Sequence, residues 1–76
     1  MKNLLELIVK SLVDNPEKIS INEISGENST IYEVKVAEED MGKVIGKQGK
    51  VAKSIRTVIK AIAAREGKRV IVEIMN

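Results

Sequence analysis

The chain has 76 residues and a mass of 8.4 kDa, enough for one small domain with a modest hydrophobic core. It contains no cysteine and no histidine, which excludes disulfide bonds, zinc sites built from those residues and nucleophile–base pairs that use them. The net charge of +2 is unevenly distributed, since residues 43–69 carry +8 and the rest of the chain carries −6. This asymmetry favours a cationic element that meets a polyanion, and a solvated lysine-rich helix is the alternative.

The first element is predicted from apolar residues at helical spacing, namely Leu4, Leu5, Ile8 and Leu12. We expect an amphipathic helix over residues 2–13, which ends before Pro16 because proline disfavours helical geometry in the residue before it. Charged residues interrupt the apolar stretch, so it does not have the pattern of a signal peptide. No segment approaches the roughly 20 apolar residues of a membrane-spanning helix. We therefore expect a cytoplasmic protein with no membrane contact.

Two strands joined by a turn are predicted next. Residues 18–24 alternate between polar and apolar and then slip in phase at Ile24, which is typical of a strand with a bulge. Residues 26–29 have turn composition, and residues 30–37 alternate again. Tyr32, the only aromatic residue, lies on the apolar face of that second strand and is expected in the core.

Two helical segments and a last strand complete the chain. The acidic residues 38–40 are expected to cap a short helical turn over residues 41–45. After the sequence Gly-Lys-Gln-Gly, a longer helix is predicted to end at Gly67, and residues 70–75 are rich in β-branched residues typical of a strand. The basic residues opposite the apolar stripe of this longer helix are expected to be solvated. The stripe comprises Val51, Ile55, Val58, Ile59 and Ile62, and the basic residues are Lys53, Arg56 and Lys60.

This order predicts an α+β fold formed by residues 1–76 as a single domain. The first two strands pair antiparallel, and the second reaches the last through two helices, so those two strands can lie parallel. A three-stranded mixed sheet covered on one face by three helices buries all the apolar stripes at once. The last strand would then lie at an edge of the sheet.

The segment with the most functional information is the glycine-containing loop over residues 42–50. Glycine lets a sugar-phosphate chain approach the backbone, and the amides at the start of the following helix favour negative charge. The spacing excludes a Walker A loop, because Gly42 and Gly46 are separated by three residues and Lys47 is followed by Gln48. No Gly-x-Gly is present either, so a dinucleotide-binding fingerprint is excluded. A tight turn that needs glycine for its geometry alone remains an alternative.

The same residues carry a family resemblance. Residues 44–50, Val-Ile-Gly-Lys-Gln-Gly-Lys, followed by Ile55 on the next predicted helix, resemble the core motif of KH domains, which bind nucleic acids through a GXXG loop. The element order resembles the type II, prokaryotic arrangement. Residues 9–16, 41–50 and 66–70 are also similar to the KhpA family of small bacterial single-KH proteins, so the similarity covers nearly the whole chain.

The resemblance implies a binding mode for single-stranded RNA. In KH domains about four nucleotides lie in a groove, with their backbone against the GXXG loop. Here residues 44–45 and 51–52 would line the helical wall of the groove, and residues 70–74 the strand side. Residues 66–69 occupy the position of the family's variable loop. The residues predicted to bind RNA are Lys43, Val44, Ile45, Gly46, Lys47, Gln48, Gly49, Lys50, Lys53, Lys68 and Arg69.

The leading hypothesis is therefore an RNA-binding protein with low sequence specificity, acting as a post-transcriptional regulator or RNA chaperone. Single-stranded DNA is an alternative ligand, because both nucleic acids present phosphates. The scarcity of aromatic residues predicts weak affinity, since stacking typically contributes about 1–3 kcal/mol per base.

A second hypothesis is a protein–protein interaction module. The resemblance implies self-pairing as a homodimer, or a heterodimer with a larger KH-containing protein of the Jag/KhpB type. An enzyme is not expected, because without histidine and cysteine the candidates reduce to a lysine or to the acidic residues 38–40, which helix capping explains. No cofactor or metal is expected.

Overall fold

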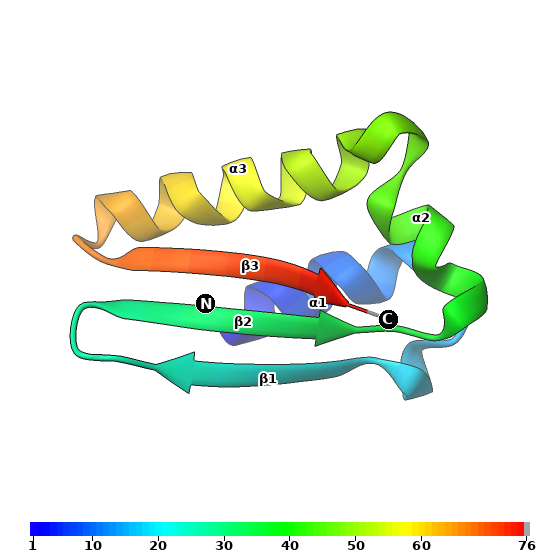
Figure 1. Cartoon of the computed structure of the whole chain (residues 1–76), viewed down its shortest axis with the longest axis horizontal. Helices are drawn as coiled ribbons and strands as arrows, with labels where there is room; N and C mark the ends of the chain where they lie inside the picture. Colours follow the sequence, from blue (N-terminus) through cyan, green and yellow to red (C-terminus); the bar gives the residue numbers. More distant parts are fainter. Residues whose placement is uncertain (76) are drawn as a thin grey trace.

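A computed structural model describes residues 1–75 of the chain. Its helices are α1 (Lys2–Leu12), α2 (Met41–Ile45) and α3 (Lys50–Arg65), and its strands are β1 (Ser20–Ser25), β2 (Ser29–Lys35) and β3 (Arg69–Met75) (Figure 1). Single 3-10 turns occupy Pro16–Lys18, Glu38–Asp40 and Lys47–Gly49. This order confirms the sequence prediction, and the ends of the elements differ from it by one or two residues.

The three strands form one mixed sheet in the order β1–β2–β3. β1 pairs antiparallel with β2, with Ile21 opposite Val34, and β2 pairs parallel with β3, with Tyr32 opposite Val72. The parallel pair is possible because α2 and α3 carry the chain back between β2 and β3. β3 therefore has a strand neighbour on one side only, as the sequence predicted, and α3 packs along it (Figure 1).

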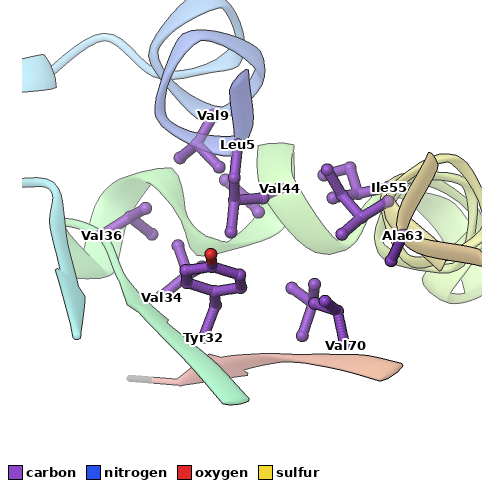
Figure 2. Close-up of a cluster of buried hydrophobic side chains, with 11 residues drawn as sticks. Leu5, Val9, Tyr32, Val34, Val36, Val44, Ile55, Ala63 and Val70 are labelled. Atoms are coloured by element: carbon purple, nitrogen blue, oxygen red, sulfur yellow. The ribbon is translucent and has the colours of Figure 1, made fainter. Parts of the chain in front are cut away.

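The hydrophobic core lies between the helices and one face of the sheet. Figure 2 shows Leu5 of α1 and Val44 of α2 pointing toward Tyr32 of β2. Each fully buried aliphatic side chain contributes about 1.5–3 kcal/mol to stability, so this layer holds the helices on the sheet. Tyr32 is 5% exposed, which confirms its predicted place in the core. The side chains with no exposed surface are Leu5, Val9, Val34, Val44, Ile59 and Ala63.

The predicted bulge at Ile24 is wrong. The pairing of β1 with β2 is continuous from Ser20 opposite Lys35 to Ser25 opposite Thr30, with one residue facing one residue throughout. Because side chains alternate between the two faces of a strand, Ile21 points to the core and Ile24 to the uncovered face, where it is 46% exposed. The phase slip in the sequence therefore marks an outward-facing isoleucine.

The buried stripe of α3 also differs from the prediction. It consists of Ala52, Ile55, Ile59 and Ala63, while Val58 is 46% exposed. At about 100° per residue, Val58 lies well to one side of the line through the buried positions. Neither α3 nor any other helix within residues 1–75 combines the length and apolar composition needed to cross a membrane.

Candidate nucleic-acid interface

The loop from Gly46 to Gly49 turns the chain between α2 and α3 through unusual backbone conformations. Gly46 has φ 76° and ψ 175°, a combination essentially confined to glycine. Gln48, with φ 58° and ψ 26°, and Gly49, with φ 73° and ψ 11°, are both left-handed. The Gly46 N–H donates to the Gly42 carbonyl at 2.8 Å, and the Gly49 N–H donates to the Gly46 carbonyl at 3.2 Å. These bonds keep the turn tight.

The two glycines of the loop have different surroundings. A Cβ on Gly46 would lie 2.7 Å from Cβ of Val51 and 2.9 Å from its amide nitrogen, so the first turn of α3 leaves no room for a side chain. A Cβ on Gly49 would have no contact within 4 Å among residues 1–75. Packing of the turn therefore explains Gly46, whereas Gly49 lies at open space beside the start of α3.

No side chain caps the start of α3. Gly49 is the N-cap residue and provides no side-chain hydrogen bond, and no acidic residue lies in the first turn of this 16-residue helix. The Lys50 N–H donates to the Lys47 carbonyl within the loop, and no acidic residue in the first turn offsets the positive end of the helix dipole. Lys47, Lys50 and Lys53 are exposed around this point. An anionic group such as a phosphate suits these surroundings.

Lys43, which precedes the glycine loop in α2, forms ion pairs within the protein. Its ammonium group forms an ion pair with Asp14 and lies 3.8 Å from a carboxylate oxygen of Asp40. The hydrogen bond to Asp14 raises the pKa of Lys43. Among the predicted site residues, Lys43 therefore differs from Lys47 and Lys50, for which no carboxylate lies within ion-pair distance among residues 1–75.

Asp40 attaches the loop-bearing helix to the connection that follows α1. Its carboxylate is 1% exposed and accepts the backbone N–H of Asp14 at 3.2 Å, the backbone N–H of Asn15 at 3.0 Å and the Asn15 side-chain amide at 3.0 Å. Burial acts to raise the pKa of Asp40, but the hydrogen bonds from Asn15 and Asp14 and the charge of Lys43 outweigh it and lower that pKa.

The predicted capping role of Asp40 is therefore wrong. Asp40 occupies the N-cap position of α2 but makes no side-chain hydrogen bond to that helix, because its carboxylate bonds to Asp14 and Asn15 instead. The consequence for the site is positional, since α2 and the glycine loop are fixed relative to α1.

The predicted apolar wall is divided between surface and core. Ile45, next to the loop, is 36% exposed, and Val51 is half-buried. Val44 has no exposed surface and points into the core (Figure 2), so it supports the wall from beneath and cannot touch a ligand in this structure. Ala52 and Ile55 are each 4% exposed.

Arg56 is not among the residues predicted to bind RNA, yet it contacts the edge of the sheet. Its Nε donates to the backbone carbonyl of Val72 at 3.1 Å, which connects α3 to the outer strand β3. A basic residue at this helical position was expected to be solvated, and nothing in the sequence shows that a strand edge lies within its reach. The contact depends on the packing of α3 along β3.

Lys68 and Arg69 lie far from the loop. They follow the C-terminal end of α3, whose 16 residues span about 24 Å at 1.5 Å per residue. Figure 1 shows the turn before β3 and the α2–α3 turn at opposite ends of this helix. The structure therefore brings residues 45–50 and Lys53 together and leaves Lys68 and Arg69 apart from them.

Comparison with known proteins gives the family. Residues 2–74 match the family described as "KhpA/KhpB, KH domain". The chain belongs to this family. It is 65% identical over 75 residues to the RNA-binding protein KhpA of Clostridium acetobutylicum, a match that covers 99% of this chain and 100% of that one. It is 45% identical over 76 residues to the RNA-binding protein KhpA of Aquifex aeolicus, covering 100% and 96% of the two chains.

Solved structures of Era have the same fold in part of their length. The chain resembles Aquifex aeolicus Era with a TM-score of 0.63 at 20% identity, covering 93% of this chain and 28% of Era. It also resembles Era solved in complex with MgGDPNP and nucleotides 1506–1542 of 16S ribosomal RNA, with a TM-score of 0.57, 22% identity and the same coverage. At this identity the likeness concerns the fold, which is that of a type II KH domain.

Proposed function

We propose that this chain binds short single-stranded RNA with low sequence specificity, through one type II KH domain spanning residues 1–76. The observation that carries the proposal is the open glycine loop at the uncapped start of α3, surrounded by exposed lysines. The relatives from Clostridium acetobutylicum and Aquifex aeolicus bear the name RNA-binding protein, which supports RNA as the ligand. The proposal includes action in the cytoplasm, as a post-transcriptional regulator or RNA chaperone.

Backbone contacts would provide most of the affinity. Phosphates would lie near Gly49 and Lys50 at the positive end of the α3 dipole, with Lys47 and Lys53 adding sequence-independent attraction. The exposed part of Ile45 and the half-buried Val51 offer apolar surface to the bases. The only aromatic side chain is in the core, so no base can stack on an aromatic ring and the affinity is expected to be weak.

Replacing Lys47 and Gln48 by aspartate tests the loop. We expect about a tenfold or greater loss of affinity for a labelled RNA octamer in fluorescence anisotropy, because the net charge of the loop becomes more negative by three units where phosphates would bind. The matched control is Lys18→Asp with Asn28→Asp, which makes the same charge change at exposed positions outside the loop. Unchanged affinity in a folded loop variant, or an equal loss in the control, would overturn the proposal.

The salt dependence tests the same proposal independently. If about three phosphates are neutralised, the logarithm of affinity should fall with a slope of about −2 against the logarithm of salt concentration. A DNA octamer of the same sequence, measured in parallel, distinguishes RNA binding from general binding of single strands. Tighter binding of the DNA would contradict RNA as the preferred ligand.

We also propose association with a second KH protein, either another copy or a larger protein of the KhpB type. The favouring observation is a row of isoleucines on the uncovered face of the sheet, where Ile24 pairs with Ile31 and Ile31 with Ile71. Ile24 is 46% and Ile71 41% exposed, so apolar surface lies open across all three strands. A single small site gains avidity from such pairing.

Light scattering with Ile71→Lys tests the association. We expect the native chain to gain mass with concentration, or on addition of a KhpB-type protein, and the Ile71→Lys variant to remain monomeric. Leu7→Lys, at a 61% exposed position on α1, is the control and should behave as the native chain does. A native chain that stays monomeric in both conditions contradicts the proposal.

A further inference from the structure

We infer that Arg56 gives the proposed RNA site a preference at one nucleotide position for a base with two neighbouring hydrogen-bond acceptors. Guanine has this pattern at O6 and N7, and cytosine has it at O2 and N3. In adenine and uracil, a hydrogen-bond donor lies next to each acceptor on the corresponding edge. The inference rests on the proposed function, because it concerns the bases of an RNA strand held by the glycine loop.

Arg56 connects α3 to the edge strand β3. It lies one turn after Ala52 on α3 and seven residues after Gly49, about 10 Å along the helix axis at 1.5 Å per residue. Its Nε bonds to the carbonyl of Val72, a residue in the middle of β3, whose outer side has no strand neighbour. Arg56 thus connects α3 to the edge of β3. An RNA strand that leaves the glycine loop between α3 and β3 would pass this side chain.

The Arg56 side chain keeps hydrogen-bond donors available for a ligand. A guanidinium has five N–H donors and no acceptor, and it stays protonated. The bond to Val72 uses Nε and fixes the plane of the group, which leaves the four donors of the two Nη atoms. Within residues 1–75 no carboxylate lies within ion-pair distance of Arg56, and the residue is exposed. A pre-positioned fork of donors is thus presented to solvent.

The choice of base follows from this donor pattern. An unoccupied strand edge offers alternating N–H donors and carbonyl acceptors, which can match the donor–acceptor edge of adenine. Arg56 places donors in front of the Val72 carbonyl, so the amino group of adenine meets another donor there. Arginine instead pairs with guanine O6 and N7 through two parallel bonds. Cytosine O2 and N3 provide the same two-acceptor edge, while the N3–H of uracil separates its two carbonyl acceptors.

The experiment uses the full chain at low salt and labelled RNA octamers in fluorescence anisotropy. The octamers are all-uridine, or uridine with one central adenosine, cytidine, guanosine or 7-deazaguanosine. We expect the cytidine or the guanosine octamer to bind about 5- to 10-fold tighter than the all-uridine and adenosine octamers, the lower part of the range for a bidentate arginine–base pair because Arg56 is exposed. If guanine is the base, 7-deazaguanosine removes the gain because it lacks the N7 acceptor.

Two substitutions assign the preference to the fork of donors. Arg56→Lys keeps the charge but not the fork, so it should abolish the preference while the charge-dependent attraction to RNA remains; Arg56→Gln removes both the fork and the charge and should also abolish the preference. Lys60→Gln, one turn further along α3 and exposed, is the matched control and should keep the preference. Melting temperatures verify that each variant is folded.

Each outcome decides the inference. Equal affinity of the native chain for all octamers, a preference for adenosine, or a preference that survives Arg56→Lys overturns it. Loss of all binding in folded Arg56→Lys also overturns it, because Arg56 would then hold the RNA backbone. If all-uridine RNA binds in a loop-dependent way without any preference, this inference alone fails; if the native chain binds no octamer, the proposed function fails with it.

Discussion

The two ends of α3 have similar composition but opposite electrostatic surroundings. Each end has a glycine with positive φ, Gly49 at the start and Gly67 after the end, and each is followed by lysine. At the start, no side chain caps the helix and no acidic residue lies in the first turn. After the end, the Lys68 N–H donates to the Ala63 carbonyl at 2.9 Å and the Gly67 N–H donates to the Ala64 carbonyl at 3.1 Å.

This difference teaches that a Gly-Lys pair acquires its role from the helix end at which it lies. The carbonyl end of a helix favours cations, so Lys68 and Arg69 complement the dipole there, and Lys68 also lies 3.7 Å from Glu66. At the amide end the same charges add to the positive end of the dipole and lack such compensation. The loop end is therefore the stronger anion site, although both ends contribute basic residues to the segment with a charge of +8.

The largest expected effect is a loss of stability on substituting the glycine before α3, compared with the glycine after it. Gly46→Ala should lower the free energy of unfolding by about 3 kcal/mol or more, because its backbone conformation is closed to other residues and its Cβ would overlap Val51. Gly67→Ala should cost only about 1 kcal/mol, since its φ of 70° is unfavourable but the added Cβ would have no contact within 4 Å in the described part of the chain beyond its own neighbours. Urea unfolding measures both, and equal losses would contradict the distinction.

Affinity for RNA should separate the two ends next. Lys47→Gln with Lys50→Gln should weaken binding of the all-uridine octamer about tenfold and reduce the salt slope by about 1.4, because two phosphate contacts are lost. Lys68→Gln with Arg69→Gln makes the same charge change and should alter affinity less than about twofold, since that turn lies a helix length from the loop. Equal losses in fluorescence anisotropy would mean that both ends contact the RNA.

The smallest expected effect sharpens the comparison through pH. The pKa of Asp40 is lowered in the folded chain, so its ionised form stabilises the fold above the ordinary aspartate pKa of about 3.9, and this contribution is lost as pH falls through the lower folded value. Asp40→Asn should therefore melt below the native chain at pH 7, and the difference should narrow below about pH 4.

Glu38→Gln is the control for that pH profile, because Glu38 is exposed and the charge change is the same. Its melting temperature should follow that of the native chain at every pH. A gap between Asp40→Asn and native that stays constant from pH 7 to pH 2 would show that the charge of Asp40 is not what stabilises the loop end.

Much of the fold could be predicted because it depends on local patterns. Alternation over residues 30–37 identified β2, and the helical spacing of Leu4, Leu5, Ile8 and Leu12 identified α1, whose apolar side packs on the core. The predictions that failed concern which face a residue occupies. Ile24 and Val58 are as apolar as buried residues, and their exposure follows from strand register and helix rotation, which sequence pattern specifies only loosely.

The candidate site could be predicted in part for the same reason. Gly46 to Lys50 are contiguous, so the loop is visible as a motif. Val44 belongs to the same motif but faces the core, because α2 turns that side toward the sheet. Asp40 looked like a helix cap, yet its partners Asp14 and Asn15 lie about 25 residues earlier in the chain.

By itself, the sequence determined the order of elements, the mixed sheet, the glycine loop and the concentration of positive charge between residues 43 and 69, since each of these is encoded by neighbouring residues. Only the tertiary structure decided which of those charges are available. It pairs Lys43 with Asp14 and sets Arg56 against the carbonyl of Val72. Those outcomes depend on contacts between residues distant in the chain, which form only when the helices pack on the sheet.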